Sequence, residues 1–318
     1  MKKSKLIAFV VIFILLIAIG CTMYFVLNRE VDVIQRQEDD YHQITYNGVD
    51  YEYNSSIITV LLLGIDSEEK QIQGQSDAIE LLIMDRENKK MKLLSFSRDI
   101  MTDIRLFDAE GNDLGWHEQH LNLAYAYGNS PQNGCMYAMQ AVSRLLNGVP
   151  IVHYAALNMN MLPEVQNLVG PMHVIVPNDS SILIDPTWSK GSMITIDANN
   201  VEKFLRSRNT GENYSNEDRM ERQKAYMEAY QSELKNRIKN DFDSMVINMF
   251  NITKQATSNI SLNDIETFAN MILEYDFNQE SDMIDIKGEN VSGAYHDEYH
   301  VDEAALRELI IELFYKKK

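Results

Sequence analysis

The chain has 318 residues, of which 45% are hydrophobic and 24% charged, and this composition is typical of a folded protein. Its 47 Asp and Glu outnumber its 29 Lys and Arg, for a formal net charge of -18. Non-specific binding of nucleic acid is thereby disfavoured, because it requires a basic surface. The two cysteines, Cys21 and Cys135, are too few for a disulfide framework.

An uncharged apolar run near the N-terminus predicts a membrane anchor. The 22 residues from Leu6 to Leu27 carry no charge and can cross the hydrocarbon core of a bilayer. Lysines precede the run and acidic residues follow it, so we expect a cytoplasmic N-terminus and an extracellular remainder. A cleaved signal peptide, or lipoprotein processing at Cys21, is the alternative. Chemistry outside the membrane has no ATP supply and should use pre-activated substrates.

The predicted organisation has three parts. Residues 1–28 form a cytoplasmic tip and a single-pass transmembrane anchor in the cell membrane, 29–55 a stalk with a small hairpin, and 56–318 one extracytoplasmic domain. In the hairpin, Asn47-Gly48 favours a tight turn between strands at 44–46 and 49–53. The almost wholly apolar segment 57–65 predicts a buried central strand.

Further strands and helices alternate along the domain. Strands are expected at 79–85, 91–96, 152–157 and 172–177. Helices are expected at 134–146, 161–168, from Ser215 behind a capping box with Asp218 to about Ile238, and at 302–315. This alternation predicts an α/β fold, in which helices cover both faces of a mixed central sheet in an α-β-α arrangement.

Acidic residues flank the most buried predicted strand. Asp66 ends that strand in Gly64-Ile65-Asp66, and Asp77 precedes the next one. Ligands of α/β sheets bind beyond the carboxyl ends of strands. Two carboxylates at adjacent strand ends could hold Mg²⁺, which needs only one or two of them plus phosphate oxygens. Stabilisation of local turns is the alternative role for both aspartates.

Ser97-Arg98-Asp99 ends the predicted strand 91–96. Arg98 and Asp99 would lie at the same sheet edge as Asp66 if the strand between them runs antiparallel. The alternative is an ordinary surface ion pair, which contributes little.

Four arginines follow near the start of the predicted long helix. The segment from Leu205 to Arg208 is interpreted as the end of a strand, which would place Arg206 and Arg208 on one face. Arg219 and Arg222 lie on one face of the first helical turns, where anions are favoured. Together the four predict a phosphate or pyrophosphate clamp. A solvated helix, in which acidic neighbours pair the arginines, is the alternative.

Several reaction classes lose support from the sequence. Cys135 has no basic neighbour and predicts a buried structural thiol. His117 and His120 have no further His or Cys partners that would suggest zinc. A Gly-x-Ser-x-Gly elbow, a Walker loop and a dinucleotide fingerprint are absent, which disfavours serine hydrolases and NTPases.

Taken together, these motifs resemble the LytR-CpsA-Psr family. They follow the predicted anchor in the family's order and are joined by a similar last helix at 309–315: Val60–Asp66, Ser76-Asp77, Ser97-Arg98-Asp99, Leu121-Asn122-x-Ala124-Tyr125-x-x-Gly128, Phe204–Arg208 and Asp218–Gln223. The resemblance covers roughly residues 57–318, and only the joint occurrence of the motifs is specific.

The resemblance implies an extracytoplasmic phosphotransferase of Gram-positive-type cell walls. Such an enzyme moves a glycan phosphate from a polyprenyl-pyrophosphate carrier to a peptidoglycan sugar hydroxyl, attaching teichoic acid, capsule or a similar polymer. Asp66 and Asp77 would hold Mg²⁺, with Mn²⁺ as a substitute, and Asp99 would orient the arginines or act as a base. Asn122 and Gln223 would contact the substrate. The pyrophosphate would be bound by Arg98, Arg206, Arg208, Arg219 and Arg222.

Departures from the family pattern leave two other functions open. His120 replaces a basic residue, Gln75 an Arg, Ala78 a Thr and Glu68 an Arg. Each change removes positive charge or a hydroxyl near the expected site. A membrane-anchored protein that binds lipid-linked glycans without chemistry is one alternative. A pyrophosphatase that uses water as the acceptor is the other.

Overall fold

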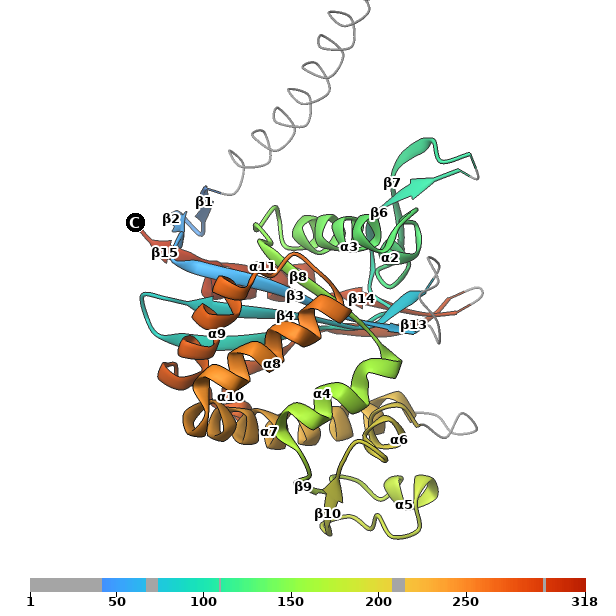
Figure 1. Cartoon of the computed structure of the whole chain (residues 1–318). Helices are drawn as coiled ribbons and strands as arrows, with labels where there is room; N and C mark the ends of the chain where they lie inside the picture. The colour runs from blue at the N-terminus through green and yellow to red at the C-terminus, as the bar shows by residue number, and fades with distance from the viewer. Residues whose placement is uncertain (1–41, 67–73, 109, 208–214, 294–295) are drawn as a thin grey trace, which may run out of the picture.

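The computed structural model describes residues 42–66, 74–108, 110–207, 215–293 and 296–318 (Figure 1). The predicted anchor at 1–28 and the stalk up to residue 41 lie outside these ranges. None of the helices in these ranges combines the length with the apolar composition that a membrane span requires.

A six-stranded mixed sheet forms the centre of an α/β fold (Figure 1). β3 runs parallel to β8 and antiparallel to β4, and β4 runs antiparallel to β5. The carboxyl ends of β3 and β5 therefore lie at one edge of the sheet. The strands predicted at 57–65, 79–85, 91–96 and 152–157 are confirmed in this sheet, although β4 begins at Gln75, before its predicted start. In spatial order the strands are β11 (Thr257–Ser258), β8 (His153–Asn158), β3 (Ile57–Asp66), β4 (Gln75–Asp85), β5 (Lys90–Phe96) and β12 (Met283–Asp285).

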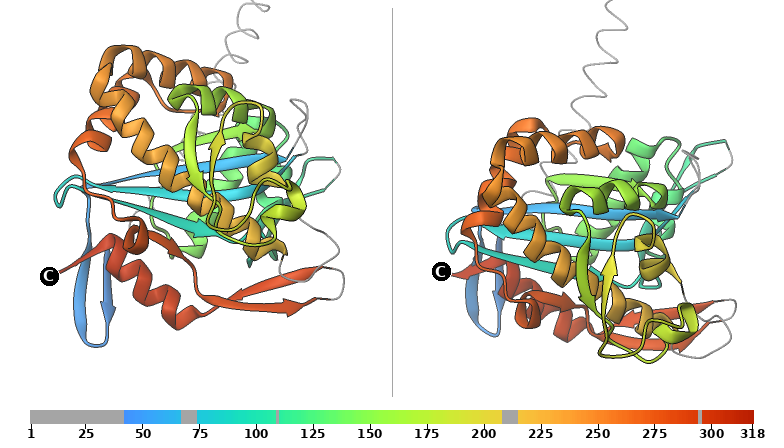
Figure 2. Two further views of the ribbon diagram at one scale, coloured as in Figure 1. Left: turned by 90° about the horizontal axis from the view of Figure 1, so that it is seen from below. Right: turned by 60° about the horizontal axis from the view of Figure 1, so that its bottom comes forward.

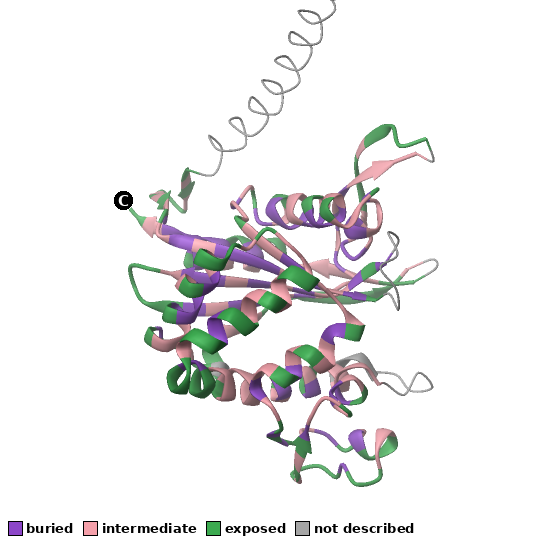
Figure 3. Ribbon diagram, in the orientation of Figure 1, coloured by how far each residue is buried: buried purple, intermediate pink, exposed green. Residues whose placement is uncertain are grey.

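Helices cover both faces of the sheet, as predicted. Leu61 and Leu63 of β3 pack on one face with α2 (Leu123–Ala126), α3 (Pro131–Leu145) and α11 (Glu303–Phe314). Val60 and Leu62 pack on the other face with α7 (Ser215–Asn240), α8 (Phe242–Gln255) and α9 (Leu262–Glu274). Seen from below, α7 crosses in front of the sheet (Figure 2), and buried residues make up much of the central strands (Figure 3). Successive side chains of β3 point to opposite faces of the sheet, so this strand contributes to a hydrophobic core on each face.

A predicted hairpin and an unpredicted one lie beside the sheet. The predicted one, β1 (Gln43–Tyr46) and β2 (Val49–Tyr53), turns through Asn47 and Gly48, both at positive φ, and pairs with β15 (Tyr315–Lys317). The second, β6 (Met101–Phe107) and β7 (Asp113–His120), projects beside α3 in Figure 1 and was not predicted. β7 is exposed or half-buried along its whole length. Its sequence therefore lacks the alternating apolar residues from which a strand can be predicted.

A third cluster of buried residues surrounds Trp188 and Phe204. The predicted strand end is wrong at Leu205 and Arg206, which lie in helix α6 (Val201–Arg206). Val201 and Phe204, three residues apart on this helix, pack in the cluster and set the helical period. The cluster also includes residues from α4 (Leu162–Val169), β9 (Met172–Ile175), β10 (Met193–Ile196) and α5 (Ser181–Ile184). The remaining elements are η1 (Met159–Met161), α10 (Gln279–Asp282), β13 (Gly288–Ser292) and β14 (Asp297–Val301).

The contact between α2 and α3 depends on a glycine. A methyl group at Gly128 would overlap the backbone of Gly134, which leaves no room for relief by a flexible side chain. We expect Gly128→Ala to lower the free energy of unfolding by roughly 1–3 kcal/mol, as overpacking does elsewhere. Urea denaturation would measure this loss. The exposed Gln132→Ala on α3 is the control and should stay within about 0.5 kcal/mol of wild type.

Candidate functional site

The strands place the two predicted aspartates at one edge of the sheet. Asp66 is the last residue of β3, and Asp77 lies near the start of β4. The ladder pairs Gly64 with Ala78 but Ile65 with Ser76, so Asp77 is the extra residue of a β-bulge. A bulge bends its strand and redirects a side chain, and bulges are frequent beside active sites. Its position supports a functional role for Asp77 over a purely local turn role.

Arg98 follows β5 and reaches the same edge, as the antiparallel course of β4 predicts. Its Nη1 lies 2.7 Å from Asp77 Oδ1, and its Nε lies 3.4 Å from Asp99 Oδ1. The side chains of Arg98 and Asp77 are only 27% and 17% exposed. Burial acts to lower the pKa of Arg98, but the charges of Asp77, Asp99 and Asp66 raise it overall. Arg98 is therefore a permanently charged guanidinium held in a defined orientation.

Arg206 reaches the site from the last residue of α6. Its Nη2 lies 2.8 Å from Asp66 Oδ1, and its Nη1 lies 2.5 Å from Glu202 Oε1, one turn earlier in the helix. The Asp66 pair joins α6 to the end of β3. Arg208, its predicted companion, lies outside the described residues.

Arg222 and Gln223 of α7 hold the end of α6. Arg222 is fully buried and donates to the carbonyl oxygens of Phe204, Ser207 and Asp218. Gln223 Nε2 donates to Leu205 O at 3.3 Å. Burial, together with nearby Arg219, lowers the pKa of Arg222 against the opposing effect of Asp218. Since Arg222 is engaged with backbone, its structural part is to position Arg206 through α6.

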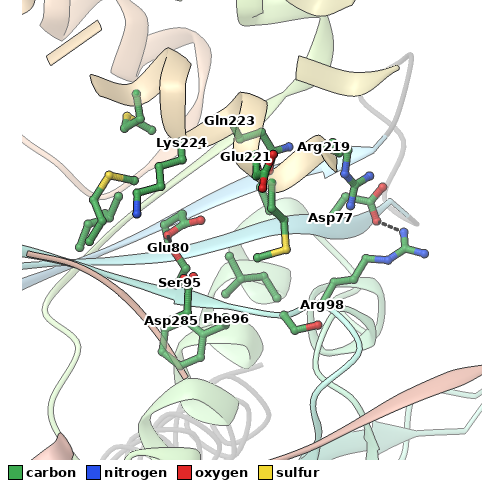
Figure 4. Close-up of a pocket in the computed structure, with 17 residues that line it drawn as sticks. Asp77, Glu80, Ser95, Phe96, Arg98, Arg219, Glu221, Gln223, Lys224 and Asp285 are labelled. Carbon is green, nitrogen blue, oxygen red and sulfur yellow. Dashed lines mark hydrogen bonds and ion pairs between the residues drawn. The ribbon is translucent and has the colours of Figure 1, made fainter. Parts of the chain in front are cut away.

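Two adjoining cavities lie at this edge. The small cavity has a volume of about 160 Å³ and is lined in part by Met159, Ala78 and Leu205. Its remaining lining consists of predicted site residues: Asp66, Asp77, Arg206, Arg219 and Gln223. The large cavity, of about 360 Å³, shares Asp77, Ala78, Arg219 and Gln223 with it and continues between the sheet and α7. Figure 4 shows Arg98, Asp77 and Arg219 toward one end of the large cavity and Glu80, Ser95 and Lys224 toward the other. Arg222 and Asn122 line neither cavity.

Asn122 forms hydrogen bonds to residues on either side of the site, next to Asp77 on β4 and at Arg98. Its backbone N–H donates to Arg98 O, its carbonyl accepts from Ser76 N–H, and its Nδ2 donates to Gln75 Oε1 at 3.1 Å. Among the described residues its buried Oδ1 has no hydrogen-bond partner. Gln75 is thus engaged by Asn122, and a ring nitrogen of His120 lies 3.1 Å from Asp297 O. Glu68, another departure from the family pattern, lies outside the described residues.

The donor set at the edge fits one divalent cation only with help from a ligand. Asp66 and Asp77 line the same small cavity. No cluster of three or more His, Cys, Asp or Glu able to hold a metal occurs in the described ranges. Mg²⁺ is commonly bound by one or two carboxylates together with substrate phosphates and water. Two carboxylates beside cationic residues fit that pattern and not a metal site made by protein alone.

Four charged residues near the site were not predicted from the sequence. Glu202 pairs with Arg206, while Glu80, Lys224 and Asp285 line the large cavity. A signal existed for Glu80, because it is the one charge in the run from Ile79 to Met84. Glu202 and Lys224 lie on helices with many charges, where no pattern distinguishes them.

Comparisons with known proteins show the family and the fold. The model of the LytR_cpsA_psr family matches residues 22–313. The polyisoprenyl-teichoic acid–peptidoglycan teichoic acid transferase TagU of Enterococcus faecalis is 31% identical over 182 residues, which covers 54% of this chain and 53% of that protein. The chain thus spans about half the length of this curated relative.

Solved structures share the fold at low sequence identity. TagT bound to LI-WTA has a TM-score of 0.60 at 22% identity and covers 81% of this chain and 90% of its own. The LytR-CPS2A-psr family protein YwtF (TagT) with bound octaprenyl pyrophosphate lipid has a TM-score of 0.58 at 20% identity, covering 86% and 94%. At these identities the likeness shows the fold.

Proposed function

The chain belongs to the LytR-CpsA-Psr family, and we propose that it transfers a glycan phosphate from a polyprenyl-pyrophosphate carrier to a sugar hydroxyl of peptidoglycan. One observation carries this proposal: Arg98, Arg206 and Arg219 converge on acidic residues where a polar cavity adjoins a partly apolar one. A lipid pyrophosphate has the matching chemistry, with an anionic head and a hydrocarbon chain. The names of TagU and of the TagT complexes with LI-WTA and with octaprenyl pyrophosphate support the same class of substrate.

The arginines supply most of the catalytic effect in this proposal. Phosphoryl transfer depends on positioning and on stabilising charge at the phosphate oxygens. The guanidinium of Arg98 is already fixed by Asp77 and Asp99, and that of Arg206 by Asp66 and Glu202. Arg219 lines both cavities and can contact a group bound between them.

The reaction exchanges a phosphoanhydride bond for a phosphate ester bond. The acceptor hydroxyl oxygen attacks the glycan-side phosphorus, the bond to the bridging oxygen breaks, and polyprenyl monophosphate leaves. Asp99 lies beside Arg98 and can take the hydroxyl proton, or it orients Arg98 for the phosphate. Asp66 and Asp77 would hold Mg²⁺, which supplies additional neutralisation of phosphate charge.

The proposed place of action is the outer face of the cell membrane. Residues 1–28 would form the anchor with the N-terminus in the cytoplasm, and the large cavity would take the first part of the carrier's chain. Ile79, Leu93, Phe96, Met220 and Met227 provide its apolar lining. Methionine side chains adapt readily to irregular apolar ligands.

A transfer assay tests the proposal. The full chain is mixed with a polyprenyl-pyrophosphate disaccharide, a peptidoglycan oligomer and Mg²⁺, and mass spectrometry follows the oligomer. We expect a phosphodiester-linked disaccharide on the oligomer, reduced at least about tenfold by EDTA and restored by Mg²⁺ or Mn²⁺, because the metal neutralises the phosphates. Donor that stays bound and unreacted would favour the non-catalytic binder. Free glycan phosphate without a modified oligomer would favour the pyrophosphatase.

A further inference from the structure

A row of side chains crosses the sheet inside the large cavity. The ladder pairs Leu62 of β3 with Glu80 of β4, Glu80 with Ser95 of β5, and Ser95 with Asp285 of β12. Leu62 packs into the core beneath α7–α9, so the row lies on that face of the sheet. Glu80, Ser95 and Asp285 line the large cavity together with Lys224 and Met227 of α7 (Figure 4). A half-buried carboxyl group therefore stands in a cavity whose lining is partly apolar.

Glu80 is held by a hydroxyl and not by a cation. Ser95 Oγ donates to Glu80 Oε2 at 2.6 Å. Glu80 forms no ion pair with any part of the chain that the structure describes. The charged groups that line the same cavity come from three directions: Arg219, Glu221 and Lys224 on α7, Asp285 on β12, and Asp77 and Arg98 at the sheet edge.

The surroundings favour the neutral form of this carboxyl. Burial, opposed by the hydrogen bond from Ser95 and assisted by the negative charge of Asp285, raises the pKa of Glu80 to about 8. Near neutral pH the carboxyl is thus mostly protonated, and its proton is lost as the pH rises through this value. An unpaired carboxylate against hydrocarbon is strongly unfavourable, whereas a protonated carboxyl bonded to a hydroxyl is tolerated.

We infer that Glu80 determines what the large cavity accepts: an apolar polyprenyl chain enters only while the Glu80 carboxyl carries its proton, so that chain binding is linked to proton uptake. The choice of a polyprenyl chain as occupant rests on the proposed function. The linkage itself rests on the position of Glu80 among Ser95, Asp285 and the apolar lining.

The expected effect follows from the protonated fraction. The apparent dissociation constant equals the intrinsic one divided by the fraction of protein that is competent to bind. With a pKa of about 8 this fraction is near one at pH 6.5. At pH 9 it is about one tenth, which weakens chain binding about tenfold.

The test uses farnesol, a polyprenol with no titratable group, and the full chain held in a peptidisc. Equilibrium dialysis of labelled farnesol from pH 6.5 to 9.5, with an empty peptidisc as the blank, gives the dissociation constant at each pH. We expect about tenfold weaker binding by wild type at pH 9 than at pH 6.5. Glu80→Gln should bind equally at both pH values, with the wild-type affinity of pH 6.5.

Two neighbouring substitutions keep the test decisive even if Glu80→Gln does not fold. Asp285→Asn removes a charge that raises the pKa of Glu80, so the midpoint of the pH dependence should move down. Ser95→Ala removes a hydrogen bond that lowers this pKa, so the midpoint should move up. Midpoints that do not move, a pH dependence that persists in Glu80→Gln, or farnesol that does not bind at any pH would overturn the inference. The assay contains no glycan, so loss of transfer activity alone would count against the proposed function and not against the linkage.

Discussion

Arg98→Ala should lower the rate of glycan-phosphate transfer by about 10²–10³-fold, the usual effect of removing a preorganised group that stabilises developing charge. Arg98 is a fixed, half-buried cation at the point where Asp77, Asp99 and the large cavity meet. Arg98→Lys should recover only part of the rate, because an ammonium lacks the planar fork that binds two phosphate oxygens. Initial rates of transfer at saturating donor would measure both variants.

The matched control for Arg98 is Arg144→Ala. Arg144 of α3 also forms an ion pair with an aspartate, at 2.8 Å from Asp103, but it lines neither cavity. Its removal should leave transfer within about twofold of wild type, since exposed pairs contribute little. Turnover by Arg98→Ala at the wild-type rate would show that Arg98 does not stabilise the phosphate in the reaction.

Arg222→Ala should act first on stability. The side chain is fully buried and donates to three backbone carbonyls, which would be left without these donors. At about 1–3 kcal/mol for each unsatisfied buried group, with partial relief by water, we expect a total loss of roughly 2–5 kcal/mol. Transfer should fall as well, because α6 carries Arg206 into the site. Urea unfolding measured together with transfer separates the two effects.

Arg237→Ala is the matched control on the same helix. Arg237 is about half exposed and pairs with Glu233 one turn away, so its removal should change stability by no more than about 0.5 kcal/mol. If Arg222→Ala kept wild-type stability while losing donor binding, Arg222 would be a direct phosphate ligand and not a positioning residue.

The central sheet could be predicted because its strands carry strong apolar patterns. In β3 both faces are buried, which gives the continuous run from Ile57 to Ile65. The segment 204–208 was misread because Phe204-Leu205-Arg206-Ser207-Arg208 fits a period of two as well as a helical one. Burial of Phe204 against Trp188, at 5.3 Å between ring centroids, belongs to tertiary structure and is invisible locally.

The site could be predicted in part for a similar reason. The position of Asp66, Asp77 and Arg98 at one edge of the sheet follows from the antiparallel course of β4 between β3 and β5. The separate places of Arg219 and Arg222 do not follow from their spacing. They depend on which carbonyls α6 leaves open beside α7, and that is fixed only when the helices pack. The bulge at Asp77 likewise has no sequence signal of its own.

The fate of oxygen in the products tests most directly whether this site transfers a glycan phosphate to a sugar. The assay is run in water enriched in ¹⁸O, and polyprenyl monophosphate and the modified peptidoglycan oligomer are quantified by mass spectrometry. We expect the two products in equal amounts and without ¹⁸O, since the attacking oxygen comes from the acceptor sugar. An ¹⁸O atom in free glycan phosphate, formed in place of the modified oligomer, would show that water is the acceptor and would contradict the transferase.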